Sequence, residues 1–246
     1  MKKLIPAFIA LILLLGCDSS SDSGNGGAGP SEAEVYFPLQ IGDWWSYDAV
    51  ELDSVENAIP GSQYAISSTV VGDTTASSHT YRIIQDSTNQ GGNWFADERR
   101  YFRIEGDTVK SLMSFFDDPG VAYEVNMAII PADVGESWTV LSLDTVMMDS
   151  AAGSLDAVLL WTGEVLTKGT VSVPAGTWDD AIHIGYQLNF EISNSDTSIL
   201  FVMERKVWIA PNIGMVRYYE AAVNGPDGYA NGTMEELVNF VAGPLP

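Results

Sequence analysis

The sequence predicts an all-β domain that follows an N-terminal signal helix and a disordered tether. Residues 181–193 alternate strictly between apolar and polar side chains, and this period of two is that of a strand with one face against a core. Short extended runs separated by Gly- and Pro-rich turns recur along the chain, and no helical stripe longer than about two turns stands out. Both observations favour β structure throughout the body.

Composition and charge exclude several classes of protein. The chain has 246 residues with 11 basic and 33 acidic side chains, a formal net charge of −22. Nucleic-acid binders need a basic patch, so we expect no nucleic acid as a partner. One cysteine excludes an internal disulfide and a cysteine-rich zinc site, and two histidines leave little for imidazole ligands. We therefore expect no metal and no cofactor.

Residues 1–16 have the features of an export signal. A short cationic segment, residues 1–3, precedes an apolar run from Leu4 to Leu15. Twelve helical residues span about 18 Å, which is short of the roughly 30 Å hydrocarbon layer of a membrane. A cleaved signal peptide is therefore favoured over a membrane-spanning helix.

The signal ends in Leu14-Leu15-Gly16-Cys17, which resembles a bacterial lipobox. The resemblance implies cleavage after Gly16 and lipidation of Cys17, so that membrane lipid is reached through the acylated cysteine. Two or more acyl chains hold a protein stably on a bilayer. We expect a lipid-anchored protein of the bacterial cell envelope, in the periplasm or on the cell surface. The alternative is an ordinary cleaved signal with a chance cysteine.

Residues 17–34 are expected to carry the lipidated cysteine and a disordered linker. Residues 18–34 include five serines, four glycines and no large apolar side chain, a composition typical of a flexible coil. From residue 35 the composition becomes apolar, and residues 35–246 fit a single β-rich domain.

The expected strands of this domain follow in order, and each is a short extended run bounded by turn residues. They are 43–50, 64–71, 80–86, 100–104, 109–115, 121–128, 138–146, 155–166, 181–193, 200–209 and 215–222. Gly106 indicates a hairpin, and residues 119–120 and 224–228 indicate turns. The C-terminal segment is open: residues 233–236 suit a short capped helix, and residues 235–241 suit a last strand.

One eight-residue pattern occurs twice: Pro, three residues, Gly, an acid, any residue, Trp. It spans Pro38 to Trp45 and again Pro131 to Trp138. Proline fixes φ and glycine supplies the turn, so the pattern predicts the same strand-entry turn in both places. It suggests two related halves, with convergence of two turns as the alternative.

Three segments together resemble a group of uncharacterised bacterial envelope proteins. They are Tyr36-Phe37-Pro38-Leu39 with the following Trp45, Val173-Pro174-Ala175-Gly176-Thr177-Trp178, and Ala210-Pro211-Asn212-Ile213-Gly214-Met215-Val216. The resemblance implies a strongly curved antiparallel sheet, a half-barrel akin to the lipoprotein-carrier folds. It supplies no catalytic residues. From the residues alone, the glycines and prolines of the last two segments indicate turns.

No residue pattern indicates catalysis. The chain lacks a nucleophile elbow, a metalloprotease helix motif, a phosphate loop and a dinucleotide fingerprint. His79 and His183 have no positioned partner in the sequence, and the pairs Asp117-Asp118 and Asp179-Asp180 are expected to be solvated caps. Most of the seven tryptophans are expected in the core, although they could line a sugar or lipid cleft. We expect no catalytic residues and no enzyme activity.

These observations leave three hypotheses. The first is a non-catalytic envelope lipoprotein that acts as a binding or interaction module for an envelope protein partner. The second is a carrier or sensor of an apolar ligand such as a lipid, which would lie in a broad apolar trough of the half-barrel. The third is a hydrolase of envelope polymers, which needs a carboxylate pair or a histidine with a close partner. The residues of the ligand site and the oligomeric state stay unassigned.

Overall fold

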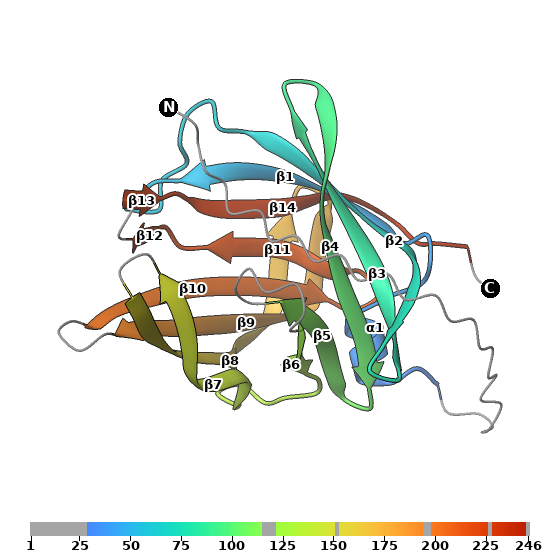
Figure 1. Ribbon diagram of the computed structural model, residues 1–246. Helices are drawn as coiled ribbons and strands as arrows, with labels where there is room; N and C mark the ends of the chain where they lie inside the picture. The colour runs from blue at the N-terminus through green and yellow to red at the C-terminus, as the bar shows by residue number, and fades with distance from the viewer. Residues whose placement is uncertain (1–28, 115–121, 151–152, 194–197, 226–227, 245–246) are drawn as a thin grey trace.

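The computed structural model describes residues 29–114, 122–150, 153–193, 198–225 and 228–244. Almost all of this chain is β structure. Twelve antiparallel strands form one sheet that curves into a nearly closed barrel, and two short strands form a separate ladder (Figure 1). The predicted all-β class and the curved antiparallel sheet are confirmed.

The large sheet contains β1 (Trp44–Leu52), β2 (Tyr64–Ala76), β3 (His79–Gln90), β4 (Asn93–Glu105), β5 (Thr108–Ser114), β6 (Ala122–Ile129), β7 (Ser137–Ser150), β8 (Gly153–Val173), β9 (Gly176–Ser193), β10 (Ser198–Ala210), β11 (Gly214–Glu220) and β14 (Gly232–Val241). The short strands β12 (Val223–Gly225) and β13 (Gly228–Ala230) pair with each other. All eleven expected strands are present, most of them longer than predicted. The C-terminal segment is a strand, so the alternative of a helix over 233–236 is wrong.

The sheet consists of two meanders of six strands each. Its order is β6-β5-β4-β3-β2-β1-β14-β11-β10-β9-β8-β7. Strands β1 to β6 follow one another in one half, and β7 to β11 with β14 make up the other. The halves are joined by the ladder between the first strand, β1, and the last, β14. Each half begins with one copy of the Pro-to-Trp pattern.

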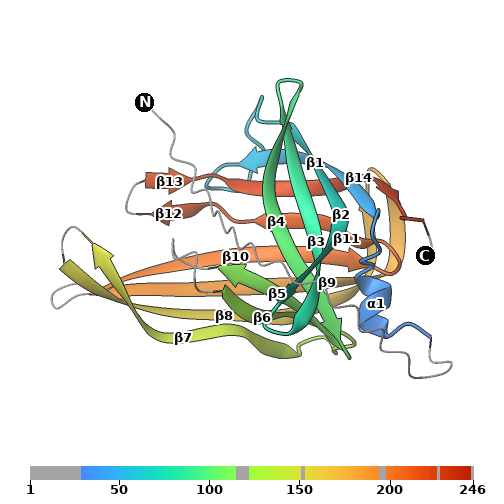
Figure 2. The same cartoon turned by 45° about the vertical axis from the view of Figure 1, so that its right-hand side comes forward.

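The edge strands β6 and β7 lie at the two ends of this order, and no ladder joins them in the described residues. Side chains bridge them instead. Trp138 of β7 donates from Nε1 to the carbonyl of Asn126 (3.0 Å), and Tyr186 of β9 donates from its hydroxyl to the carbonyl of Met127 (2.7 Å). The two rings meet edge to face with centroids 6.3 Å apart. The barrel therefore closes through side chains at this seam. Figure 2 shows the ribbon of the sheet from a second direction.

The apolar core fills much of the concave face. The alternating segment 181–193 behaves as predicted, because Ile182, Ile184 and Tyr186 are all less than a tenth exposed. Large side chains from both halves meet there, and they include Trp45, Tyr47, Phe102, Trp138, Trp161, Ile209 and Leu237. Gly185 allows the Leu166 side chain to approach the backbone closely, because an added Cβ would lie 2.8 Å from it.

The repeated pattern forms the same turn twice. Gly42 and Gly135 adopt φ values of 96° and 86°, in a region where L side chains are strained. Gly42 donates its N–H to the Val70 carbonyl (2.8 Å), and Gly135 donates to the Val165 carbonyl (2.8 Å). Val70 and Val165 donate back to the residue after each glycine. The turn before β1 is thus hydrogen-bonded to β2, and the turn before β7 is hydrogen-bonded to β8. The strand-entry prediction is confirmed.

The acid after each glycine completes the turn. The Asp43 carboxylate accepts from the N–H of Gln40 (2.8 Å), and the Glu136 carboxylate accepts from the N–H of Asp133 (2.9 Å). Asp43 also accepts from the N–H of Gly243 (2.8 Å), which ties the C-terminal segment to the same turn. The acid in the pattern therefore satisfies backbone donors three residues earlier.

Residues 31–36 differ from the prediction of a linker up to residue 34. They form helix α1 (Glu32–Tyr36) with a capping box, in which the Ser31 hydroxyl accepts from the N–H of Glu34 and the Glu34 carboxylate accepts from the N–H of Ser31. Ala33 is fully buried in the core. Five residues are too few to show helical periodicity. The serine and glutamates of this segment therefore matched the composition expected of a linker. The folded body begins earlier than residue 35.

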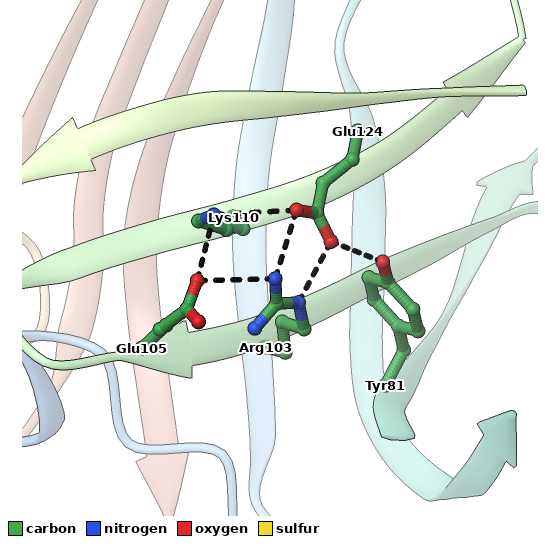
Figure 3. Close-up of polar contacts among 5 residues, drawn as sticks. All are labelled: Tyr81, Arg103, Glu105, Lys110 and Glu124. Atoms are coloured by element: carbon green, nitrogen blue, oxygen red, sulfur yellow. Dashed lines mark hydrogen bonds and ion pairs between the residues drawn. The ribbon is translucent and has the colours of Figure 1, made fainter. Parts of the chain in front are cut away.

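A polar network fastens strands β3 to β6 on the outer face (Figure 3). Arg103 donates to both carboxylate oxygens of Glu124 (2.7 and 2.8 Å), and the Tyr81 hydroxyl donates to the same carboxylate. Lys110 lies 2.7 Å from Glu105 and 3.3 Å from Glu124. Because the Arg103 side chain is only 10% exposed, screening by water and salt weakens this network less than it weakens an ion pair on the open surface.

Replacing the glycines of the strand-entry turns is expected to destabilise the fold. Gly135→Ala adds no clash, so it reports the backbone strain alone, about 1–2 kcal/mol. Gly42→Ala should lower the free energy of unfolding further, because its Cβ would lie 3.1 Å from Pro244. Urea unfolding measures both, with Gly29→Ala, at an open position of ordinary φ, as the control. Equal stability of all three variants would contradict the shared turn.

Glu124→Gln is expected to reduce the free energy of unfolding at pH 7 by about 1 kcal/mol. Hydrogen bonds from Arg103 hold the pKa of Glu124 at about 2, below its ordinary value. Stabilisation from a lowered carboxyl pKa is complete above the unfolded-state pKa of about 4.5 and is lost as the pH falls toward 2. Unfolding by urea at several pH values should therefore show the two proteins converging in acid. The exposed Glu204→Gln is the control, and a gap independent of pH would contradict the network.

Candidate functional site

The candidate residues of the sequence do not come together in one place. His79 begins β3 and is exposed, whereas His183 lies partly buried in the middle of β9. Asp179 and Asp180 are exposed near the start of β9. Cys17 and the pair at 117–118 lie outside the described residues.

His183 is part of an aromatic stack on the outer face. Its ring lies parallel to that of Trp208, with centroids 4.0 Å apart and planes 10° apart, and the Arg217 guanidinium lies 5.4 Å from the same indole. Burial lowers the pKa of His183, and the charges of Lys206 and Arg217 lower it further. No carboxylate hydrogen-bonds to His183 among the described contacts. The stack therefore favours a neutral imidazole with a packing role.

Asp179 and Asp180 line an open groove of about 540 Å³ beside α1. Glu32, Tyr36 and Lys168 also line it, and the Tyr36 hydroxyl donates to the Asp180 carbonyl (2.7 Å). Asp179 accepts from the Thr170 hydroxyl. The described residues contain no group of three or more His, Cys, Asp or Glu side chains able to hold a metal ion.

The tryptophans divide between core and surface. Trp45, Trp138 and Trp161 are buried and Trp94 is 53% exposed, whereas Trp44, Trp178 and Trp208 are half-buried, so three of the seven are fully in the core where most were expected. The exposed indole stands alone near the end of the β3–β4 hairpin and does not form a cleft with the buried ones.

Charged side chains lie on the concave face beside the apolar core. We call this group the lumen cluster, and it comprises Asp86, Glu98, Arg100, Arg205, Glu220 and Glu235. The pairing registers place it inside. Arg100 is two residues from the core side chain Phe102 on β4, and Arg205 lies directly opposite the core side chain Tyr186.

The first ion pair of the lumen cluster joins β3 and β4. Arg100 contacts both carboxylate oxygens of Asp86, with Nε 2.6 Å and Nη2 2.9 Å away. The buried Ser68 hydroxyl of β2 donates to the same carboxylate (2.6 Å). The side chains of Arg100 and Asp86 keep 33% and 15% of their exposure, so water reaches the pair.

The second ion pair joins β10 and β11. Arg205 Nε lies 2.6 Å from the Glu220 carboxylate, and the Tyr218 hydroxyl donates to that carboxylate (2.6 Å). Burial raises the pKa of Tyr218 well above its ordinary value, so this hydroxyl keeps its proton. Arg205 and Glu220 are 31% and 27% exposed, which again leaves them in contact with solvent.

Glu235 of β14 lies between the two ion pairs. Burial raises the pKa of its carboxyl to about 7, although the charge of Arg100 acts in the opposite direction. Burial also raises the pKa of Glu98 on β4, against the charges of Arg100 and Arg205. The lumen cluster thus holds four acids and two arginines, and carboxylate charge is in excess.

A broad apolar trough is absent from the described part of the concave face. One part is a packed core, with Ile184, Ile209 and Leu237 almost fully buried, and the other part carries the lumen cluster. Transfer of a lipid chain onto paired charges is unfavourable, because the charges would lose water without gaining partners. This arrangement argues against the lipid-carrier hypothesis.

The sequence contains a signal for the lumen cluster. Arg100 and Phe102 share one face of a strand, and so do Arg205 and Val207. A charged side chain two residues from an apolar core side chain points toward the interior of the barrel. Such a charge needs an oppositely charged partner. Asp86 and Glu220 are those partners, but only the folded sheet shows that they are neighbours.

The described residues contain no helix that is both long enough and apolar enough to cross a membrane. The chain matches no protein-family model, and no curated protein shows significant sequence similarity to it.

Two solved structures are similar in fold. A candidate lipoprotein from Parabacteroides distasonis is 13% identical with a TM-score of 0.50, and the match covers 84% of this chain and 98% of that one. A candidate exported protein with a YmcC-like fold from Bacteroides fragilis is 14% identical with a TM-score of 0.47, over 84% and 98% of the two chains. The first of these likenesses shows a shared fold for the barrel-shaped sheet.

Proposed function

We propose that this protein is a non-catalytic lipoprotein of the bacterial cell envelope, whose barrel-shaped body binds a polar ligand on its concave face. The observation that supports this proposal most directly is the lumen cluster. Its ion pairs lie beside a packed core yet keep contact with water. Buried or half-buried ion pairs contribute little to stability compared with apolar packing. A role in recognition accounts for charges in this position.

The envelope assignment is supported by the lipobox and by the fold. Residues 14–17 supply the lipidation pattern. The structure that shares the fold at a TM-score of 0.50 is described as a candidate lipoprotein. With so few basic side chains, the body has little attraction for anionic lipid, so acyl chains on Cys17 are needed to hold it on a membrane.

Hydrolysis of envelope polymers has less support. Among the described contacts neither histidine has a carboxylate partner, and two of the four carboxylates of the lumen cluster, Asp86 and Glu220, are bound to arginines. A general acid or base needs a partner group or a substrate proton within hydrogen-bond reach. The geometry favours binding over turnover.

Replacing the lipidated residue is expected to release the protein. Cys17→Ser removes the sulfur to which the first acyl group is attached, so the body should move from the membrane fraction to the soluble envelope fraction. Fractionation with immunodetection measures this, and Asp18→Asn, beside the cysteine, is the matched control that should stay on the membrane. Membrane retention of the serine variant would refute the anchor.

The polar-ligand role predicts which molecules accompany the purified body. Native mass spectrometry of the soluble Cys17→Ser protein should show small polar adducts and no fatty acid or phospholipid, because the described concave face offers charged groups and a packed core. Removing the first ion pair by the joint change Arg100→Met and Asp86→Leu should reduce these adducts while the fold is kept, because it makes part of the lumen cluster apolar. A lipid adduct on the wild-type body would favour the carrier hypothesis instead.

A further inference from the structure

One cross-strand row forms the centre of the lumen cluster. Tyr64 of β2 lies opposite Ala49 of β1, Ala49 lies opposite Glu235 of β14, and Glu235 lies opposite Tyr218 of β11. Residues directly opposite in neighbouring strands project on the same face. Glu235 therefore has Tyr218 as its cross-strand neighbour on one side, and on the other side Tyr64 lies one strand further away, beyond the small Ala49.

Several charged and titratable groups surround this row. From β1, β2, β3, β4 and β11 they are Tyr47, Tyr64, Asp86, Arg100, Tyr218 and Glu220. Burial raises the pKa of Tyr47 and of Tyr64, so these phenols stay neutral, and the Tyr47 hydroxyl donates to the Met215 carbonyl (3.1 Å). Arg100 and Arg205 are each already neutralised by a carboxylate at 2.6 Å.

Glu235 has no ion pair and no hydrogen bond among the described contacts. It is partly buried, and burial raises its pKa to about 7; the charge of Arg100 lowers this pKa, but Arg100 is already paired with Asp86, and the charges of Asp86 and Glu220 raise it. A neighbouring cation would supply a counter-charge. Since the described residues offer no set of three ligating side chains for a metal, a cation with a diffuse charge suits the site better than a hard metal ion.

We infer that the concave face binds an organic ammonium ion, with the Glu235 carboxylate as its counter-charge and the rings of Tyr64 and Tyr218 beside it. This inference rests on the proposed polar-ligand function and names its ligand class. Tyrosine rings attract alkylammonium groups through their negative faces, and the attraction grows where water is partly excluded. The excess of carboxylates over arginines in the lumen cluster supports the same sign of charge.

The binding test uses choline as the probe and 3,3-dimethyl-1-butanol as its uncharged analogue of the same shape. Isothermal titration calorimetry of the soluble Cys17→Ser protein at pH 8 in about 0.15 M salt should show choline binding and no binding of the alcohol. At pH 5 most Glu235 is protonated, so the affinity should fall at least about tenfold. At pH 7, binding should release about half a proton, measured by comparing buffers of different ionisation enthalpy.

Glu235→Gln keeps the shape of the side chain and removes its charge. It should lower choline affinity at pH 8 at least about tenfold and abolish the pH dependence. The variant is expected to fold, and at pH 8 to melt no lower than wild type, because a carboxyl with a raised pKa destabilises the folded state once ionised above pH 7. Glu236→Gln is the matched control. Glu236 is next to Glu235 in the sequence but is ion-paired with Arg217 on the outer face, so this variant should bind choline with the affinity of the wild type.

The outcomes separate this inference from the function on which it rests. No choline binding by wild type at pH 8, equal binding of the uncharged alcohol, or equal loss in both glutamine variants would overturn the ammonium site. The membrane fractionation and the polar adducts in native mass spectrometry do not use choline. They decide the anchored binding function separately.

Discussion

The structure depends on one hydrogen-bonded turn that is built twice. Gly42 and Gly135, each with a positive φ, lie in the turn just before the first strand of each half. The acid after each glycine accepts a hydrogen bond from the backbone N–H three residues earlier. Each turn also places an indole in the core, Trp45 in one half and Trp138 in the other. The two turns thus join the first strand of each six-strand meander to the shared core. The same residues occur at the same spacing because both halves use the same turn.

The distribution of charge in the body follows a second constraint. Basic side chains are few, and the structure uses most of them in specific contacts. Arg100, Arg103 and Arg205 are ion-paired, and Arg217 joins Glu236 to the carbonyl of Ser172. The unpaired acids remain in excess on the surface and in the lumen cluster. The charged interior is therefore a local arrangement within an acidic protein, and two of its four carboxylates, Glu98 and Glu235, have no ion pair among the described contacts.

Local pattern predicted most of the fold because strand periodicity and turn residues act over short distances. The alternating segment ending at residue 193, the hairpin at Gly106 and the turn before Gly214 were all evident from the sequence. Helix α1 was missed because Ser31 and its neighbours have linker composition, and a five-residue helix has no periodicity to detect. The lumen cluster was missed for a different reason: its ion pairs join residues 14 or 15 positions apart, and only the strand register makes them neighbours.

The two boundaries between the halves of the barrel are unequal. Strands β1 and β14 are joined by a backbone ladder, whereas β6 contacts the other half through the side chains of Trp138 on β7 and Tyr186 on β9. Among the described contacts, this second boundary has two side-chain hydrogen bonds, an aromatic contact and the packing of β6 core side chains, and it has no backbone ladder. On this side, the closure of the barrel thus depends on side-chain contacts and not on backbone pairing among the described residues.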